Sequence, residues 1–192
     1  MYIFLKQAVS IKPKPVHLSE QANKALHFLY TRINNLNLPV DLILKLFDHT
    51  ILPILSYSSE IWGGYGNFDQ IERIHKLFLR YITKHKKSKP IYMLMGELGR
   101  YPIEVTIKSR MIGYWYRLLT GKQTKLAYTI YQTMLRIPNF QSKWITCIQN
   151  ILAEIGRMDL WNNQNNLPQY SIKRLIKQIL IDQYKHNWHS SL

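Results

Sequence analysis

The chain has 192 residues, of which 46% are hydrophobic, and a formal net charge of +15 at pH 7. This composition excludes a disordered chain and predicts one folded domain or two small ones. The single cysteine, Cys147, excludes an intrachain disulfide framework and any zinc module built from several cysteines.

The excess of Lys and Arg favours a polyanionic partner, with nucleic acid ahead of an acidic membrane surface. The alternative is charge that only keeps the protein soluble. No apolar run approaches the roughly 18 residues that span a membrane. The apolar start, "MYIFLKQAVS", is interrupted by Lys6 and has no convincing cleavage site. We therefore expect an intracellular protein, nuclear or cytoplasmic and not secreted, with no membrane partner.

The predicted elements are helical along the whole chain. An irregular tail over residues 1–16 ends in "KPKP", where the prolines favour extended backbone. The apolar stretch 40–62 predicts a core helix that Pro53 should kink or break. Residues 67–83 and 103–120 are strongly helical, and three further helical patterns complete the chain. Since no period-2 strand of any length occurs, the sequence predicts an all-α fold. We expect an irregular bundle of about seven to nine helices with no significant β-sheet.

Basic residues concentrate in residues 71–125, which hold 13 Lys and Arg against three acids. On the first helix of this window they are spaced three or four residues apart, opposite an apolar face of Ile71, Ile74 and Phe78. The loop "KHKKSK" extends the row. Such a row suits the phosphates of a nucleic acid, although a solvated helix face is the alternative. The predicted contacts are Arg73, Lys76, Arg80, Lys84, Lys86, Lys87 and Lys89.

A second candidate face lies on the next long helix. Arg110, Tyr114 and Arg117 recur at i, i+4 and i+7, so they share one side. The tyrosine would stack on a base or sugar while the arginines hold phosphate. An ordinary tyrosine at the rim of the core is an equal alternative. Arg100 is a further predicted contact.

The sequence offers no catalytic centre. The eleven acids are scattered, whereas two-metal phosphoryl transfer needs clustered carboxylates. The histidines form no HExxH motif, and no Gly-rich phosphate loop occurs. We therefore expect no catalytic residue, no metal, no cofactor and no small-molecule substrate. A basic helical chain of this kind is typical of a binding module.

The stretch "MGELGRYP" predicts a structural joint between the two basic helices. Gly96 should end a short turn over "IYMLM", and Gly99 should take a positive φ or allow close backbone approach. Pro102 suits the first turn of the next helix. Glu97 should pair with an arginine, Arg100 or Arg73, or cap helix N–H groups.

Several segments in order resemble one known family. They are "LFDHTILPILSYSSEIWG", "IERIHKLFLRYIT", "MGELGRYPI", "MIGYWYRLL", "WITCIQNILAEIGRMDLW" and "LIKQILIDQYKHNWHSSL". Together they resemble the region just after the polymerase palm in non-LTR (LINE-type) retrotransposon endonuclease–reverse transcriptases. The resemblance covers about residues 18–192, and it includes Glu60 and Trp62. The family position occupied here by Ser58 is usually Gly, and the first residues do not match the usual join between palm and thumb.

The resemblance implies a thumb-like region over residues 17–120 and a post-thumb region over residues 121–192. In the family the catalytic aspartates and the endonuclease lie upstream, so this chain would have no polymerase activity of its own. The thumb grips the duplex through its backbone, which implies RNA, DNA or an RNA–DNA hybrid as partner. The rivals are a helical module that docks a protein, such as a polymerase palm in trans, and a retroelement remnant with no function.

Overall fold

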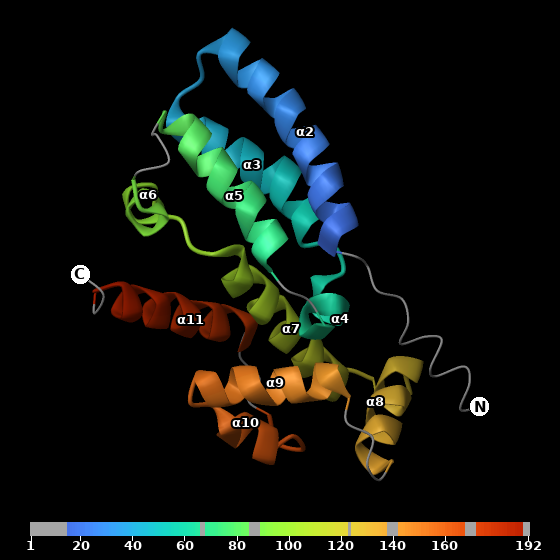
Figure 1. Ribbon diagram of the computed structural model, residues 1–192. Coiled ribbons are helices and arrows are strands. Elements are labelled where there is room, and N and C mark those ends of the chain that lie inside the picture. The colour runs from blue at the N-terminus through green and yellow to red at the C-terminus, as the bar shows by residue number, and fades with distance from the viewer. Residues whose placement is uncertain are drawn as a thin grey trace. The chain divides into compact units, whose positions relative to one another are not determined.

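The computed structural model describes residues 15–65, 68–84, 89–122, 124–137, 142–167 and 172–189. Within these residues the fold is all-α, as predicted, and no strand is present (Figure 1). The described residues form ten α-helices, several only one or two turns long, which is consistent with the expected irregular bundle of about seven to nine helices. The helices are α2 (Pro15–Leu36), α3 (Val40–Leu55), α4 (Ser59–Trp62), the 3-10 helix η1 (Gly63–Tyr65), α5 (Asp69–Ile82), α6 (Ile91–Glu97), α7 (Ile103–Thr120), α8 (Leu126–Arg136), α9 (Lys143–Glu154), α10 (Met158–Asn162) and α11 (Ile172–His189).

The chain divides into two compact units. The first unit comprises Met1–Ser58 and Gly66–Glu104, and the second comprises Ser59–Tyr65 and Val105–Leu192. The division therefore falls inside α7, whereas the regions expected from the resemblance meet at residues 120 and 121. The short segment of α4 and η1 leaves the first unit and joins the second, which no local pattern in the sequence indicated.

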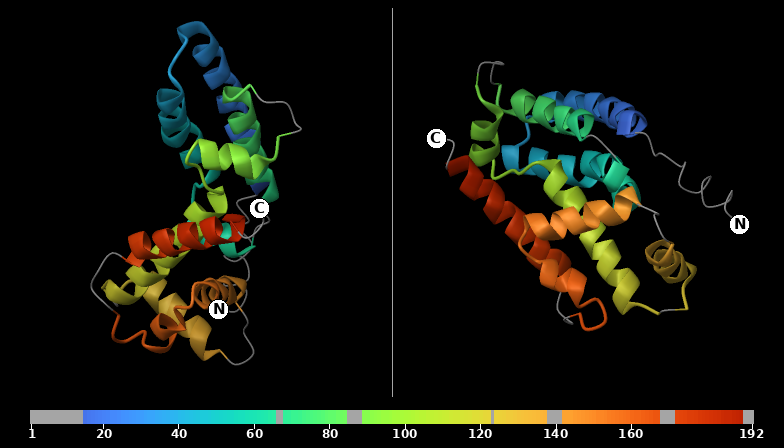
Figure 2. Two further views of the ribbon diagram at one scale, coloured as in Figure 1. Left: turned by 90° about the vertical axis from the view of Figure 1, so that its left-hand side faces the viewer. Right: turned by 60° about the horizontal axis from the view of Figure 1, so that its bottom comes forward.

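The core of the first unit lies between α2, α3 and α5, which pack against one another (Figures 1 and 2). Phe47 of α3 stacks on Phe78 of α5 with ring centroids 4.2 Å apart, and both side chains are buried. Tyr30 of α2 stacks on Tyr81 of α5, and the Tyr81 hydroxyl donates to Asn34 at 2.6 Å. Aromatic pairs therefore join all three helices.

The boundaries of the first two helices differ from the expectation in two ways. The helix α2 begins at Pro15, so the last two residues of the predicted tail are helical. The helix α3 continues through Pro53 to Leu55 and is not broken there. Pro53 is exposed and lies two residues before the helix end, so the single hydrogen bond that it removes lies on the solvent side.

The core of the second unit is built around tryptophan. Trp62 and Trp115 are 2% and 0% exposed, and Trp115 stacks on Trp161 with centroids 5.9 Å apart. The Trp115 indole N–H donates to the Tyr131 hydroxyl at 3.1 Å, and that hydroxyl donates to Gln164 Oε1 at 2.8 Å. Burial raises the pKa of Tyr131, although its hydrogen bonds to Trp115 and Gln164 oppose the shift. Tyr131 thereby fixes α8 to α7 and to the turn after α10.

Candidate nucleic-acid interface

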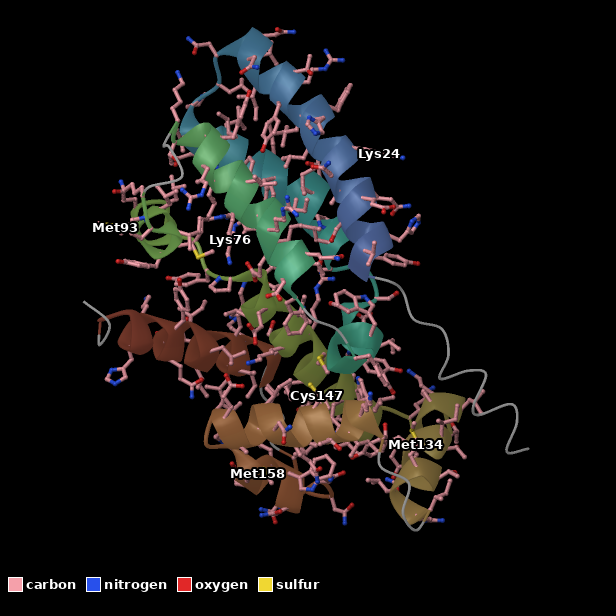
Figure 3. The ribbon with its side chains drawn as sticks, viewed as in Figure 1. Lys24, Lys76, Met93, Met134, Cys147 and Met158 are labelled. Atoms are coloured by element: carbon pink, nitrogen blue, oxygen red, sulfur yellow. The ribbon has the colours of Figure 1, made fainter. Side chains whose placement is uncertain are left out.

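The exposed side of α5 carries the first part of the predicted basic row. Ile71, Ile74 and Phe78 are buried, at 0%, 6% and 0% exposure, while Arg73 and Lys76 are exposed on the opposite side. Figure 3 shows Lys76 on the side of α5 that faces away from α2. The helical period therefore predicted correctly which face of α5 meets the solvent.

The row ends earlier than its spacing suggested. Arg80 is half-buried, and its Nη1 donates to the carbonyl oxygen of Lys89 at 3.0 Å. The helix ends at Ile82, and Lys84 has a φ of 54°, so this residue terminates the helix instead of continuing the row. Its side chain is exposed. Lys86 and Lys87 lie outside the described residues.

Lys89 is part of a structural pair. Its Nζ donates to Glu97 Oε1 at 2.6 Å, so Glu97 pairs with this lysine and not with Arg100 or Arg73 as expected. Gly96 lies inside α6, which continues to Glu97, and it does not end the turn. Gly99 has a φ of +60°, so the expected positive φ is confirmed. The alternative, close approach of another backbone segment, does not occur, because no atom lies within 4 Å of the place where a Cβ would be. Pro102 directly precedes α7.

Arg100 is held by Asp48 of α3. Its Nη1 donates to Oδ2 at 2.8 Å and its Nη2 donates to Oδ1, which makes a two-pronged pair. The Arg100 side chain is 17% exposed, and its guanidinium lies 6.0 Å from the Phe47 ring centroid. This arginine therefore links the joint after α6 to α3, a role that the sequence analysis did not assign to it.

Glu72 also has a role that the sequence did not suggest. The first turn of a helix favours anions, but Glu72 is only 8% exposed. Its Oε1 accepts the backbone N–H of Glu104 at 3.0 Å, so it caps the first turn of α7. Its Oε2 lies 3.7 Å from Nδ1 of the buried His75. The spacing of 32 residues between Glu72 and Glu104 gave no signal for this contact.

On α7 the predicted face is only partly open. Arg110 and Tyr114 are half-buried and Arg117 is exposed. The Tyr114 ring meets Trp144 of α9 edge-on with centroids 6.1 Å apart. Burial, followed by the charge of Glu60, raises the pKa of Tyr114, and Arg117 opposes the shift. Tyr114 therefore belongs to the rim of the core, which was the alternative interpretation.

The motif residues Glu60 and Trp62 have structural roles in the second unit. The Glu60 carbonyl oxygen accepts the Trp144 indole N–H at 2.7 Å, while Trp62 is buried. A Cβ on Gly64 would lie 3.0 Å from the Trp144 Cα, so η1 meets the backbone of α9 closely. The segment "EIWGG" therefore packs η1 against α9.

A row of cations on α11 was missed by the sequence analysis. Lys173, Arg174 and Lys177 are all exposed, at a spacing that matches one helix face. The spacing of the basic residues in "KRLIK" is the sequence signal for this row.

The described residues contain no cluster of three or more His, Cys, Asp or Glu side chains that would hold a metal ion. None of the helices in those ranges is long and apolar enough to cross a membrane. Comparisons with family models, curated proteins and solved structures give no match to this chain.

Proposed function

We propose that this chain binds the backbone of RNA, DNA or an RNA–DNA hybrid without sequence preference. In this proposal these 192 residues correspond to the thumb and post-thumb portion of a LINE-type reverse transcriptase and have no polymerase activity of their own. The observation that carries the binding proposal is the exposed basic side of α5. Arg73 and Lys76 lie one helical turn apart, opposite buried Ile74 and Phe78. The ordered resemblance of six segments supports the origin.

The test is a salt titration of binding to a labelled duplex of arbitrary sequence, followed by fluorescence anisotropy. Each lysine or arginine at a phosphate contributes about 0.9 to the slope of log affinity against log salt concentration. The variant Arg73→Gln/Lys76→Gln should therefore lower the slope by about 1.8. The matched control is Lys24→Gln/Arg32→Gln, which removes the same charge from exposed positions of α2. Lys24 projects away from α5 (Figure 3).

Equal slopes for the two double variants would show that only the total charge matters, and the proposed site on α5 would be wrong. Binding of the unchanged chain that is equally tight at about 50 mM and about 200 mM salt would remove the proposal as a whole. Primer extension that depends on a divalent metal would contradict the proposed lack of polymerase activity.

A second candidate function rests on a different surface. Large apolar side chains are exposed on α2 and α3, among them Phe28 at 64% and Leu36 at 60%. Exposed apolar side chains of this size suit a protein-docking site, and a polymerase palm in trans would be the partner. Association that ignores salt and is lost in Leu36→Ser would favour this candidate over nucleic-acid binding.

A further inference from the structure

The helix α11 buries three apolar residues and exposes three basic ones. Ile172, Ile176 and Leu180 are 1%, 0% and 4% exposed, so one side of the helix is buried in the second unit. Lys173 and Lys177, spaced by one turn of about 6 Å, lie on the solvent side together with Arg174. These three cations therefore form a row that the core of the second unit holds in place.

The position of α11 is fixed near both of its ends. Gly113 of α7 is buried, and a Cβ there would lie 3.2–3.3 Å from Cβ, Cγ and Cδ of Lys173. The aliphatic part of Lys173 thus lies directly on α7. Towards the other end, Gln183 donates to the Glu154 carbonyl oxygen of α9 at 2.7 Å. Figures 1 and 2 show α11 beside α7.

This contact brings a fourth cation to the row. Arg117 follows Gly113 by four residues, so both lie on the same side of α7. Since the stem of Lys173 rests on Gly113, the exposed Arg117 lies within one turn of α7 from the start of the α11 row. Residues far apart in the sequence therefore contribute to one cationic surface.

The charges on α11 are arranged for an external anion. Lys173 and Lys177 are like charges at i and i+4, a pairing that destabilises an isolated helix. The one acid in the sequence of this helix, Asp182, accepts from the Gln178 amide at 2.9 Å. The row is therefore not compensated by an acid one turn away on its own helix. A ligand that carries a row of negative charges would relieve this repulsion.

The buried side of α11 distinguishes between two kinds of polyanion. A helix that lies on a membrane inserts its apolar side between the lipids. Here that side, Ile172, Ile176 and Leu180, is already covered by the protein. The part of α11 that a ligand can reach is its row of cations, which suits the phosphates of a nucleic-acid backbone.

We propose that Lys173, Arg174 and Lys177 of α11, with Arg117 of α7, form a second surface that binds the nucleic-acid backbone. The proposal rests on the proposed function for the class of ligand, but it uses residues of the second unit only and does not need α5. Because the four side chains contact phosphates and not bases, this surface adds affinity and salt dependence without sequence preference.

The test uses the full chain and the pair Arg174→Gln/Lys177→Gln, with Lys125→Gln/Arg136→Gln at the two ends of α8 as the matched control. All four positions are exposed. The α11 pair should lower the slope of log affinity against log salt by about 1.8 for a labelled duplex. Affinity at about 50 mM salt should fall by at least about tenfold, and the control pair should change it less than about threefold.

The outcomes separate this surface from the one on α5. A normal slope in the α11 pair, with a reduced slope in Arg73→Gln/Lys76→Gln, overturns the inference and leaves the proposed function intact. The reverse result supports α11 and removes α5. Loss of binding to phosphatidylserine vesicles, with unchanged duplex binding, overturns the inference in favour of a membrane surface. If circular dichroism shows lost helix in the α11 pair, Lys177→Gln alone should lower the slope by about 0.9, and no decrease overturns the inference.

Discussion

The two units both carry basic residues at helical spacing, but they use these residues differently. In the first unit Arg80 bonds to a backbone carbonyl, Lys89 pairs with Glu97, and Arg100 pairs with Asp48. In the second unit Lys173 and Lys177 point to solvent above a buried apolar side. The second unit also has internal ion pairs, Lys108–Glu154 and Arg157–Asp159, so the contrast is between the paired cations around α6 and the exposed row on α11.

Basic residues at helical spacing indicate a ligand surface only where the fold leaves them exposed. A cation close to an acid in the fold is often structural, even where the sequence separates the two widely. Asp48 and Arg100 are 52 residues apart, so no local pattern connects them. A row of cations stands out as a ligand surface only when the fold provides no such partner.

The largest expected effect comes from Trp62→Ala. Trp62 lies in the sequence between helices of the first unit, yet it is buried in the second. Truncating a large buried side chain costs about 3–5 kcal/mol. Hydrogen exchange should therefore increase in α9 and the second-unit part of α7, while α2, α3 and α5 keep their protection. Equal loss of protection in α3 and α5 would show that the two units do not behave as separate cooperative bodies.

A smaller effect is expected from Glu72→Ala in the first unit. The substitution leaves the Glu104 N–H without its acceptor, which costs about 1–3 kcal/mol. The control Glu72→Gln keeps an acceptor oxygen and should retain most of the stability in urea denaturation. If Gln is as harmful as Ala, the charge beside His75 is the important feature and not the capping of α7.

The sequence predicted those features of the first unit that depend on neighbouring residues. The helical period identified the all-α class, and the buried positions Ile71, Ile74 and Phe78 followed from spacing alone. The positive φ of Gly99 followed from its place after a helical turn. Each of these features is decided within about one or two helical turns.

What could not be predicted depends on contacts between distant segments. The partner of Glu97 is Lys89 because α6 brings the two together, although an arginine was the more obvious candidate. Pro53 lies inside a helix because its missing hydrogen bond falls at an exposed end. Glu60 and Trp62 belong to the second unit because Trp144, 84 residues after Glu60, bonds to the Glu60 carbonyl oxygen. The spacing of charged residues along the sequence predicts none of these three features.

The smallest predicted effects concern two ion pairs of the first unit, one partly buried and one more exposed. The Asp48–Arg100 pair is two-pronged, and its side chains are 34% and 17% exposed. Glu97 is 51% exposed in its pair with Lys89. Double-mutant cycles with Asp48→Asn and Arg100→Gln should give a coupling of about 1 kcal/mol, against about 0.2–0.5 kcal/mol for Glu97→Ala with Lys89→Gln.

The same variants also bear on nucleic-acid binding. Because Arg100 is held by Asp48, Arg100→Gln should lower stability while changing the slope of log affinity against log salt by less than about 0.5. A slope that falls by about 0.9 with no change in stability would show that Arg100 leaves Asp48 to contact phosphate. The contrast between the paired Arg100 and the exposed row on α11 would then be weaker, because Arg100 would exchange its carboxylate partner for phosphate on binding.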